Sequence, residues 1–266
     1  MASTNQNRVT KIKDLLKSQI TQHFSATLLR EPDIVNIVNA LIFRESGFNA
    51  NALGNSVGYY PRTGGAAYFN SSAVNSKFQS PDSTPMQRDN IFQGLRAMGL
   101  MQVMGWYFVR GGNPTGKSEM EQLRPDLAPS LMVNPGDSIV DKILGEANMD
   151  KAILAGLIIL EGKYRYVKTV SSGSGIYFTV PGDPYSRKFV SKMQAAISAY
   201  LGLGKMDMNG TTPESYSASI LGGSAYAKAN GTGSLFVRDS EIKLASSASP
   251  QRDTTLAAIK IPGCSA

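Results

Sequence analysis

IVNIVNALIFRESGFN, residues 34–49, is the stretch that decides the fold, because its apolar residues recur with the period of an α-helix. Pro32 and Asp33 stand just before it, where a proline suits the first turn and an acid favours the positive end of the helix dipole. We therefore expect a helix over about residues 34–48. One face of this helix collects its apolar side chains, namely Ile34, Ile37, Val38, Leu41 and Phe48.

Glu45 falls in the middle of that apolar face, where a core residue would be expected. Burial disfavours the charged form of a carboxylic acid, so a buried Glu45 would have a raised pKa and would hold its proton near neutral pH, as a general acid must. Two structural explanations remain open from the pattern alone. Glu45 could pair with a buried Arg or Lys, or the helix could leave the core at this point.

The amino-acid composition limits the kinds of site and of acid-base group that the chain can use. Its 266 residues are enough for one large domain or two small ones, and 27 Lys and Arg against 20 Asp and Glu give a net charge of +7. This charge favours an anionic partner such as nucleic acid, a membrane surface or the bacterial cell wall. Cys264 and His23 are the only residues of their kinds, which excludes disulfide pairing within the chain and a Cys-rich metal site. Acid-base chemistry would then rest on carboxylates.

Further elements follow from the same reasoning along the chain. We expect an amphipathic N-terminal helix within residues 1–30, which packs on the main domain or docks on a partner protein. We expect helices at 91–109, 149–163, 187–201 and 214–220, and a β-hairpin of strands 164–170 and 175–180. Residues 221–266 are rich in Gly and Ser, which predicts a tail that wraps the domain or docks elsewhere.

Two short motifs match known catalytic or binding patterns without the context that those patterns need. GGNPTGKS, residues 111–118, fits the phosphate-binding pattern GxxxxGK[ST], but the helix after it would be short and meets Pro125. GNSVG, residues 54–58, spells a nucleophile elbow, but the single histidine precedes it. Dense Lys and Arg clusters of a nucleic-acid reader are absent from the sequence. We therefore predict neither nucleotide nor nucleic-acid binding.

Four segments, taken in order, resemble the lytic transglycosylases that are related to goose-type lysozyme. ESGFN at 45–49 with Asn51 and Ala52 is similar to the family's first motif, and GLMQV at 99–103 is similar to its second. AILAGLIIL at 152–160 stands where the family has its buried central helix, and AAISAYLGLG at 195–204 resembles its AxYNxGxG segment. The resemblance covers most of residues 33–220 and implies a mainly α, lysozyme-like domain over 31–220 with a small β-hairpin insertion.

The sequence departs from the family pattern in three places. More than fifty residues separate Glu45 from the second motif, against about twenty in the family, so we infer an insertion near 58–90. Leu201 stands where the family has an asparagine, and the hairpin at 164–180 is an addition. None of these changes removes the acid, although the sugar-binding groove would be reshaped.

The resemblance implies a role for each matching residue. Glu45 would be the catalytic acid, and Ser46, Met101, Gln102 and Tyr200 would bind substrate or orient the acid. Met101 could instead fill the core, and Tyr200 could be an ordinary core aromatic. The substrate would be the glycan strand of peptidoglycan, cut between N-acetylmuramic acid and N-acetylglucosamine, with no metal or other cofactor. A muramidase with the same fold but a hydrolytic outcome is the alternative.

Delivery to the wall is a separate expectation. Residues 1–17 lack the apolar segment of a secretory signal, and no stretch reaches the length of a membrane span. We therefore expect synthesis in the host cytoplasm and transport in a bacteriophage particle, bound to tail or baseplate proteins. Release at host lysis, and a virion component with minor or lost activity, are the alternatives.

Overall fold

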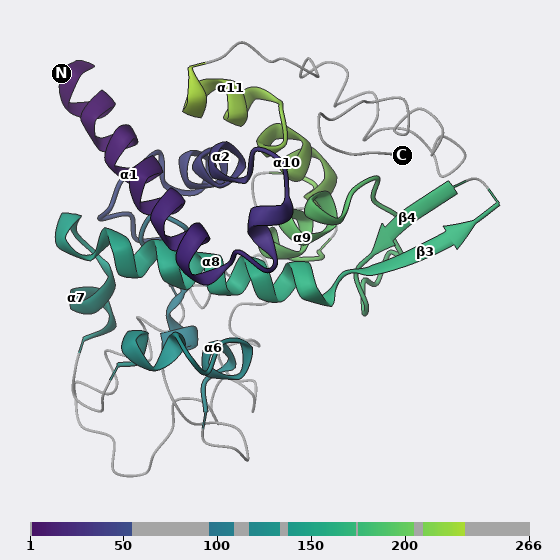
Figure 1. Ribbon diagram of the computed structural model, residues 1–266, viewed down its shortest axis with the longest axis horizontal. Coiled ribbons are helices and arrows are strands. Elements are labelled where there is room, and N and C mark those ends of the chain that lie inside the picture. Colours follow the sequence, from purple (N-terminus) through teal and green to yellow (C-terminus); the bar gives the residue numbers. More distant parts are fainter. Residues whose placement is uncertain are drawn as a thin grey trace. The chain divides into compact units, whose positions relative to one another are not determined.

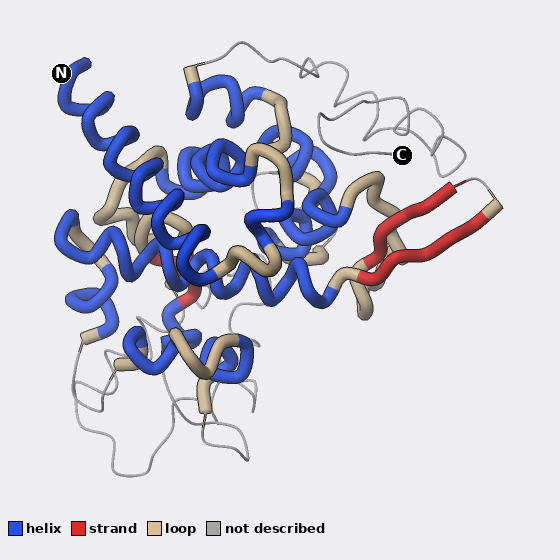
Figure 2. Tube along the Cα trace, in the orientation of Figure 1, coloured by secondary structure: helices blue, strands red, loops and turns tan. Residues whose placement is uncertain are grey.

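The computed structural model describes residues 2–54, 96–108, 117–133, 138–173, 175–204 and 210–231. The chain divides into two compact units. One unit comprises residues 1–44 and 160–266, and the other comprises residues 45–159. The described parts of both are mainly helical with small two-stranded antiparallel sheets, which confirms the mainly α class (Figures 1 and 2).

The first unit begins with helix α1 (Ala2–His23), which confirms the expected N-terminal helix. Its buried side chains recur every four residues and form one stripe, made of Ile12, Leu16, Ile20 and Phe24. A single 3₁₀ turn, η1 (Leu28–Arg30), leads to α2 (Ile34–Ser46), the helix predicted from residues 34–48. The first backbone bond of α2 runs from the Ile37 N–H to the carbonyl of Asp33 at 3.0 Å.

Helix α8 (Met149–Tyr166) and the hairpin after it lie close to their predicted positions. Strands β3 (Lys168–Ser172) and β4 (Gly175–Thr179) pair antiparallel, from Lys168 opposite Thr179 to Ser172 opposite Gly175. In Figure 1 the hairpin extends beyond the C-terminal end of α8. Residues 164–166 continue the helix, so the first strand begins later than predicted.

Helix α9 (Lys192–Leu201) is shorter than the helix expected over 187–201. Ser191 caps its start, because the Ser191 side chain accepts a hydrogen bond from the Gln194 N–H. The residues before the cap are extended instead, and Phe189 forms an antiparallel bridge with Phe178 of β4. The prediction of helix over 187–190 was therefore wrong, because pairing with a strand edge competes with local propensity.

Two short helices complete the described part of the first unit. Helix α10 (Pro213–Ile220) begins at a capping box of Thr212 and Ser215 and confirms the helix expected at 214–220. Helix α11 (Ser224–Asn230) was not predicted, and it packs beside α10. Asn39 of α2 donates from Nδ2 to the Ala229 carbonyl at 3.1 Å, so residues 224–230 belong to this unit's core.

One helix that the sequence predicts in the second unit is not formed by the described residues, and this affects the candidate site. The helix predicted over 91–109 is wrong for the described residues 96–108, which form strands β1 (Ala97–Met98) and β2 (Val103–Met104) and a 3₁₀ turn, η3 (Gly105–Phe108). The turn between the strands holds Gly99 at φ +73° and Gln102 at φ +48°. Two left-handed residues cannot be accommodated in an α-helix.

The remaining elements of the second unit are short. They are α6 (Glu119–Leu123), η4 (Ala128–Leu131), α7 (Ile139–Ile143), η5 (Glu146–Asn148) and the first part of α8. No helix in the described ranges has both the length and the apolar composition that a bilayer crossing requires.

Candidate active site

Glu45 lies in the last turn of α2, in line with the buried side chains that precede it. Leu41 and Val38, four and seven residues earlier, are fully buried, whereas Glu45 is half-buried. The carboxylate therefore sits where the apolar face of the helix reaches the edge of the core. This position combines partial burial with access, both of which a general acid needs.

The helix that carries Glu45 ends abruptly because two successive residues are left-handed. Gly47 has φ +60° and Phe48 has φ +66°, and the Asn49 N–H then bonds to the Ser46 carbonyl at 3.1 Å. A left-handed glycine after the last helical residue is the usual way to stop an α-helix. Ser46 is half-buried, next to this stop.

The chain after the stop pairs with the hairpin that contains the second quoted motif. The Gly54 N–H donates to the Ala97 carbonyl at 2.8 Å, and the Gly99 N–H donates to the Ala52 carbonyl at 2.9 Å. Leu53 and Met98 form an antiparallel bridge. Residues 52–54 thus act as a third extended segment beside β1, and they join the two motifs across more than forty intervening residues.

Gln102 reinforces this junction with its side chain. Its Nε2 donates to the Ala52 carbonyl at 3.2 Å and to the Gly99 carbonyl at 2.9 Å. Both amide hydrogens are therefore engaged inside the protein, and Oε1 faces Gly54, where it would lie 3.2 Å from an added Cβ. The sequence predicted a substrate-binding amide here, and the structure adds that the same amide holds the turn.

Met101 is fully buried and packs against helix α8. A Cβ added at Gly156 would lie 2.3 Å from Met101 Sδ and 2.5 Å from Met101 Cβ, so only a glycine fits beneath this side chain. Gly99 contacts α8 in a similar way, since its added Cβ would lie 3.1 Å from Ala152 Cβ. This burial favours the core role of Met101 over a place on the surface of a groove.

The second unit thus brings together three of the four quoted segments. It contains 45–52, 99–103 and residues 152–159 of the third segment. Tyr200 belongs to the first unit, where it is half-buried in the last turn of α9. Its role toward Glu45 therefore stays a prediction.

Three other acids are buried among the described residues, and each has a structural partner. Glu121 closes the capping box at the start of α6 with Ser118. Glu161, which sequence reasoning missed, accepts from Thr27 Oγ1 at 2.5 Å and pairs with Arg165 at 2.8 Å. Asp183 pairs with Arg187 at 3.0 Å. The Glu161 signal was present in the sequence as an acid directly after the apolar run 152–160 of α8.

The GGNPTGKS segment, in its described part, has little of the architecture that a phosphate-binding loop requires. Residues 111–116 lie outside the described ranges, as do Ser56 and the inferred insertion at 58–90. Ser118 caps the five-residue helix α6 with its side chain, and the strands in the described ranges are antiparallel. A phosphate loop needs a long helix after a strand of a parallel sheet.

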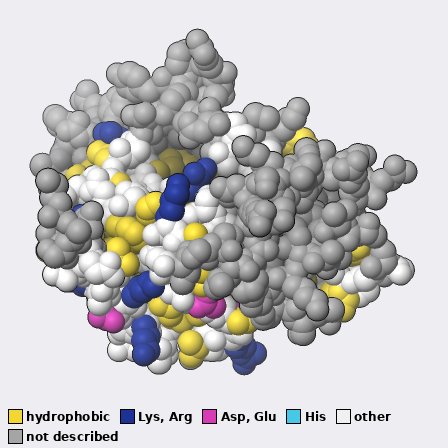
Figure 3. All heavy atoms as spheres, turned by 90° about the horizontal axis from the view of Figure 1, so that it is seen from above, with side chains coloured by type: hydrophobic (Ala, Val, Ile, Leu, Met, Phe, Trp, Pro, Cys, Tyr) yellow, Lys and Arg dark blue, Asp and Glu magenta, His cyan; other side chains and the backbone are white. Residues whose placement is uncertain are grey.

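Charge is dispersed over the face drawn in Figure 3, where the described Lys and Arg side chains lie in several separate places with apolar and neutral side chains between them. Within the described ranges, no three His, Cys, Asp or Glu side chains are grouped closely enough to hold a metal ion. Glu45 is half-buried at the end of α2, and the segment that follows it pairs with the 97–102 hairpin from Ala52 onward.

Comparisons of the chain with protein-family models, curated proteins and solved structures found no match.

Proposed function

We propose that the protein is a peptidoglycan lytic transglycosylase that uses Glu45 as its acid and then as its base. The observation that carries the proposal is the hydrogen-bonded junction between the segment after Glu45 and the 99–102 turn. The resemblance to the lytic transglycosylases was drawn from local sequence, and it implies that these two segments lie together; the junction agrees with that implication. A lysozyme-like fold for residues 31–220 belongs to the same proposal.

The reaction needs one carboxyl group that changes its protonation state. Glu45 protonates the glycosidic oxygen between N-acetylmuramic acid and N-acetylglucosamine, and the bond from the muramyl C1 to that oxygen breaks. The acetamido oxygen of the muramyl residue stabilises the cationic C1 that forms. Ionised Glu45 then takes the proton of the muramyl 6-hydroxyl, whose oxygen bonds to C1. The product is a 1,6-anhydro ring, made without water and without the second carboxylate of most glycosidases.

The supporting residues act through position. Gln102 Oε1 accepts a hydrogen bond from a sugar N–H or O–H. By the resemblance, the Tyr200 hydroxyl would orient Glu45. Met101 supports the 99–102 turn by packing on Gly156 of α8. The net charge of +7 favours binding to the anionic wall.

Substitution of Glu45 by Gln tests the assignment. The change keeps the shape and removes the transferable proton, so release of soluble fragments from purified sacculi should fall by at least about 100-fold. Glu146→Gln is the matched control, because Glu146 is exposed in the same unit and should keep parental activity. Lysis by folded Glu45→Gln at near the parental rate would refute the assignment and favour a virion component without this chemistry.

Mass spectrometry of the fragments distinguishes the two enzymatic outcomes. A transglycosylase leaves anhydromuramyl ends, which are lighter by one water than the reducing ends left by a hydrolase. Anhydromuramyl ends are expected as the main product. Reducing ends as the main product would assign the protein to the muramidases.

A further inference from the structure

The hairpin of β3 and β4 and the residues beside it carry much of the positive charge of the chain. Residues 161–192 contain six Lys and Arg against two acids, so they hold +4 of the total net charge of +7. Each acid is buried and pairs with an arginine, Glu161 with Arg165 and Asp183 with Arg187. The remaining cations form no ion pair with an acid of the described residues, and they are Lys163, Lys168, Lys188 and Lys192. This segment therefore attracts anions.

The same segment exposes large apolar side chains. Among the described residues, six large hydrophobic side chains are exposed, and four of them belong to this segment, namely Tyr166, Val170, Ile176 and Tyr185. Ile176 is the most exposed of the six, at 59%. A concentration of exposed apolar side chains in one short segment marks an interaction surface.

The strand register places two of the lysines in one row at the base of the hairpin. Lys168 of β3 pairs with Thr179 of β4. The antiparallel bridge of Phe178 with Phe189 continues the sheet, so Lys188 lies on the other side of Thr179. Side chains that lie opposite each other in an antiparallel sheet share a face, so the two lysines flank Thr179 on one face.

The exposed aliphatic side chains lie farther toward the tip of the hairpin. Val170 is two rows beyond the lysine row, and Ile176, which pairs with Ser171, is three rows beyond it. A strand rises about 3.3 Å per residue, so these two side chains lie about 7 Å and about 10 Å from that row. Figure 1 shows that the hairpin projects beyond the end of α8. Apolar side chains thus occupy the outer half of the hairpin, and cations occupy its base.

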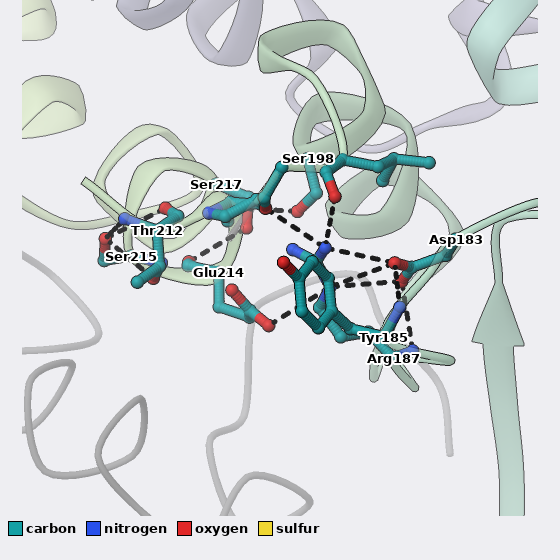
Figure 4. Close-up of polar contacts among 11 residues, drawn as sticks. Asp183, Tyr185, Arg187, Ser198, Thr212, Glu214, Ser215 and Ser217 are labelled. Carbon is teal, nitrogen blue, oxygen red and sulfur yellow. Dashed lines mark hydrogen bonds and ion pairs between the residues drawn. The ribbon is translucent and has the colours of Figure 1, made fainter. Parts of the chain in front are cut away.

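The ion pair of Asp183 and Arg187 holds the chain at the base of the hairpin (Figure 4). The Asp183 carboxylate accepts hydrogen bonds from the N–H groups of Tyr185 and Arg187, both at 3.0 Å. Arg187 Cζ lies 4.8 Å from the centre of the exposed Tyr185 ring. Tyr166, the last residue of α8, is exposed at the other end of the base. Two tyrosines therefore accompany the lysines at this level.

We infer that the hairpin of β3 and β4 binds the surface of a bilayer that contains anionic lipids. Val170 and Ile176 enter the boundary between head groups and acyl chains, where peripheral segments bury apolar side chains to a depth of about 5–10 Å. Lys168 and Lys188 then lie beside the lipid phosphates, at the level that tyrosine side chains also favour. An anionic wall polymer would account for the lysines but not for the aliphatic side chains beyond them.

Cosedimentation of the full chain with lipid vesicles tests the inference. Vesicles of equal parts phosphatidylcholine and phosphatidylglycerol should bind the protein, and vesicles of phosphatidylcholine alone should bind it much more weakly. A rise in salt from 0.1 M to 1 M shortens the screening length from about 10 Å to about 3 Å and should weaken the binding. Failure of the folded protein to bind the anionic vesicles at low salt would overturn the inference.

Single lysine substitutions show whether the hairpin makes the contact. Lys168→Gln and Lys188→Gln should each weaken binding to the anionic vesicles by about 5-fold. Lys228→Gln is the matched control, because Lys228 is exposed on α11 of the same unit, and it should change the binding little. Equal losses in all three variants would show that net charge alone matters, and would refute binding through the hairpin.

Ile176→Ser tests the apolar contact and should weaken binding by about 10-fold. Leu29→Ser is its control, because Leu29 is exposed in η1 of the same unit. Insertion can also be followed with a polarity-sensitive dye on Ile176→Cys in a Cys264→Ser background, since Cys264 is the single cysteine of the chain. The emission should shift to the blue when anionic vesicles are added, and the same dye on Leu29→Cys should not respond. An unchanged emission from position 176 would contradict insertion of the tip.

Purified sacculi distinguish the wall from the bilayer. Loss of sacculus binding in Lys168→Gln and Ile176→Ser, with no binding of the parent to anionic vesicles, would assign this surface to the wall and overturn the inference. The inference does not depend on the proposed chemistry of Glu45. Glu45→Gln should therefore bind the vesicles as the parent does, whatever its activity on sacculi.

Discussion

Replacement of Gly156 by alanine should destabilise the second unit, although alanine is the better helix former. Gly156 lies within α8, where removal of a glycine ordinarily gains about 1 kcal/mol. The added methyl group would lie 2.3 Å from Met101 Sδ, 2.5 Å from its Cβ and 2.8 Å from its Cε. Carbon atoms at their optimal separation are about 3.5–4.0 Å apart, so the neighbours must move by about 1 Å.

The identity of the clashing atoms sets the size of the effect. Sδ and Cε can swing away by rotation of the Met101 side chain, but Cβ moves only with the backbone of the 99–102 turn. Overpacking of this kind costs about 1–3 kcal/mol, and the upper end applies where backbone must shift. After the helix gain of about 1 kcal/mol is subtracted, the free energy of unfolding should fall by about 2 kcal/mol.

Trp106, the single tryptophan of the chain, lies in η3 of the same unit and provides the assay. Urea unfolding followed by its fluorescence should show a lower midpoint for Gly156→Ala. Gly173→Ala is the control, because nothing lies within 4 Å of a Cβ added there. Unchanged or increased stability of Gly156→Ala would refute the packing argument.

A double-mutant cycle with Met101→Ala sharpens the test. Met101→Ala alone should cost about 2–5 kcal/mol through loss of buried atoms and the cavity they leave. The alanine at 156 then fills part of that cavity, so its cost in this background should be smaller by at least about 0.5 kcal/mol. Strict additivity would show that the two side chains do not meet.

Four further predictions follow from other parts of the structure. Burial and a hydrogen bond to Asp33 raise the pKa of the Tyr226 hydroxyl to about 12. The stability that this hydroxyl contributes is therefore complete below pH 10 and is lost as the pH rises to 12. The free energy of unfolding of Tyr226→Phe should depend less on pH between these values. Calorimetric titration with ATP or GTP and magnesium should show no specific binding, and micromolar binding that Lys117→Ala abolishes would contradict this. Replacement of residues 55–95 by a short turn should keep the Trp106 unfolding transition, because Gly54 and Ala97 are already hydrogen-bonded at 2.8 Å. If residues 232–266 carry the protein on a phage particle, their deletion should abolish its recovery with purified particles while α11 and lysis are retained; unchanged recovery would exclude this tail as the anchor.

The elements that sequence reasoning found are those whose own residues decide them. α2 and α8 have apolar stripes at helical spacing, and the hairpin of β3 and β4 has β-rich strands around a Ser-rich turn. Glu45 was found in the same way, as a departure from such a stripe. Local patterns were sufficient for the two helices because each buries the face that its own periodicity defines, whereas the hairpin followed from its β-rich composition, since residues 168–171 of β3 are exposed.

The elements that sequence reasoning missed depend on partners far away in the sequence. α11 contains few large apolar residues, and hydrogen bonds from Asn39 to Ala229 and Asn230 tie it to α2 across some 190 residues of sequence. The run at 96–108 is apolar enough for a buried helix, but it forms a hairpin that pairs with residues 52–54 and holds Gly99 and Gln102 in left-handed conformations. The contacts of Arg187 with the Leu203 and Gly204 carbonyls could not be predicted either, since these partners lie sixteen and seventeen residues away.

The long spacing between the two motifs, which departs from the family pattern, has a structural explanation at its two ends. Arg96 Nε donates to the Gly54 carbonyl at 2.7 Å, and the Gly54 N–H donates to the Ala97 carbonyl at 2.8 Å. The residues on either side of 55–95 are thus hydrogen-bonded to each other, and this pairing fixes the register between the segment after Glu45 and the 99–102 turn. The entropy of closing a loop grows only with the logarithm of its length, so a doubling adds about 0.6 kcal/mol. A long connection between residues 54 and 96 therefore adds little cost to the junction itself. Under the proposed function, we expect exchange of residues 55–95 to alter substrate preference while the roles of Glu45 and Gln102 are kept.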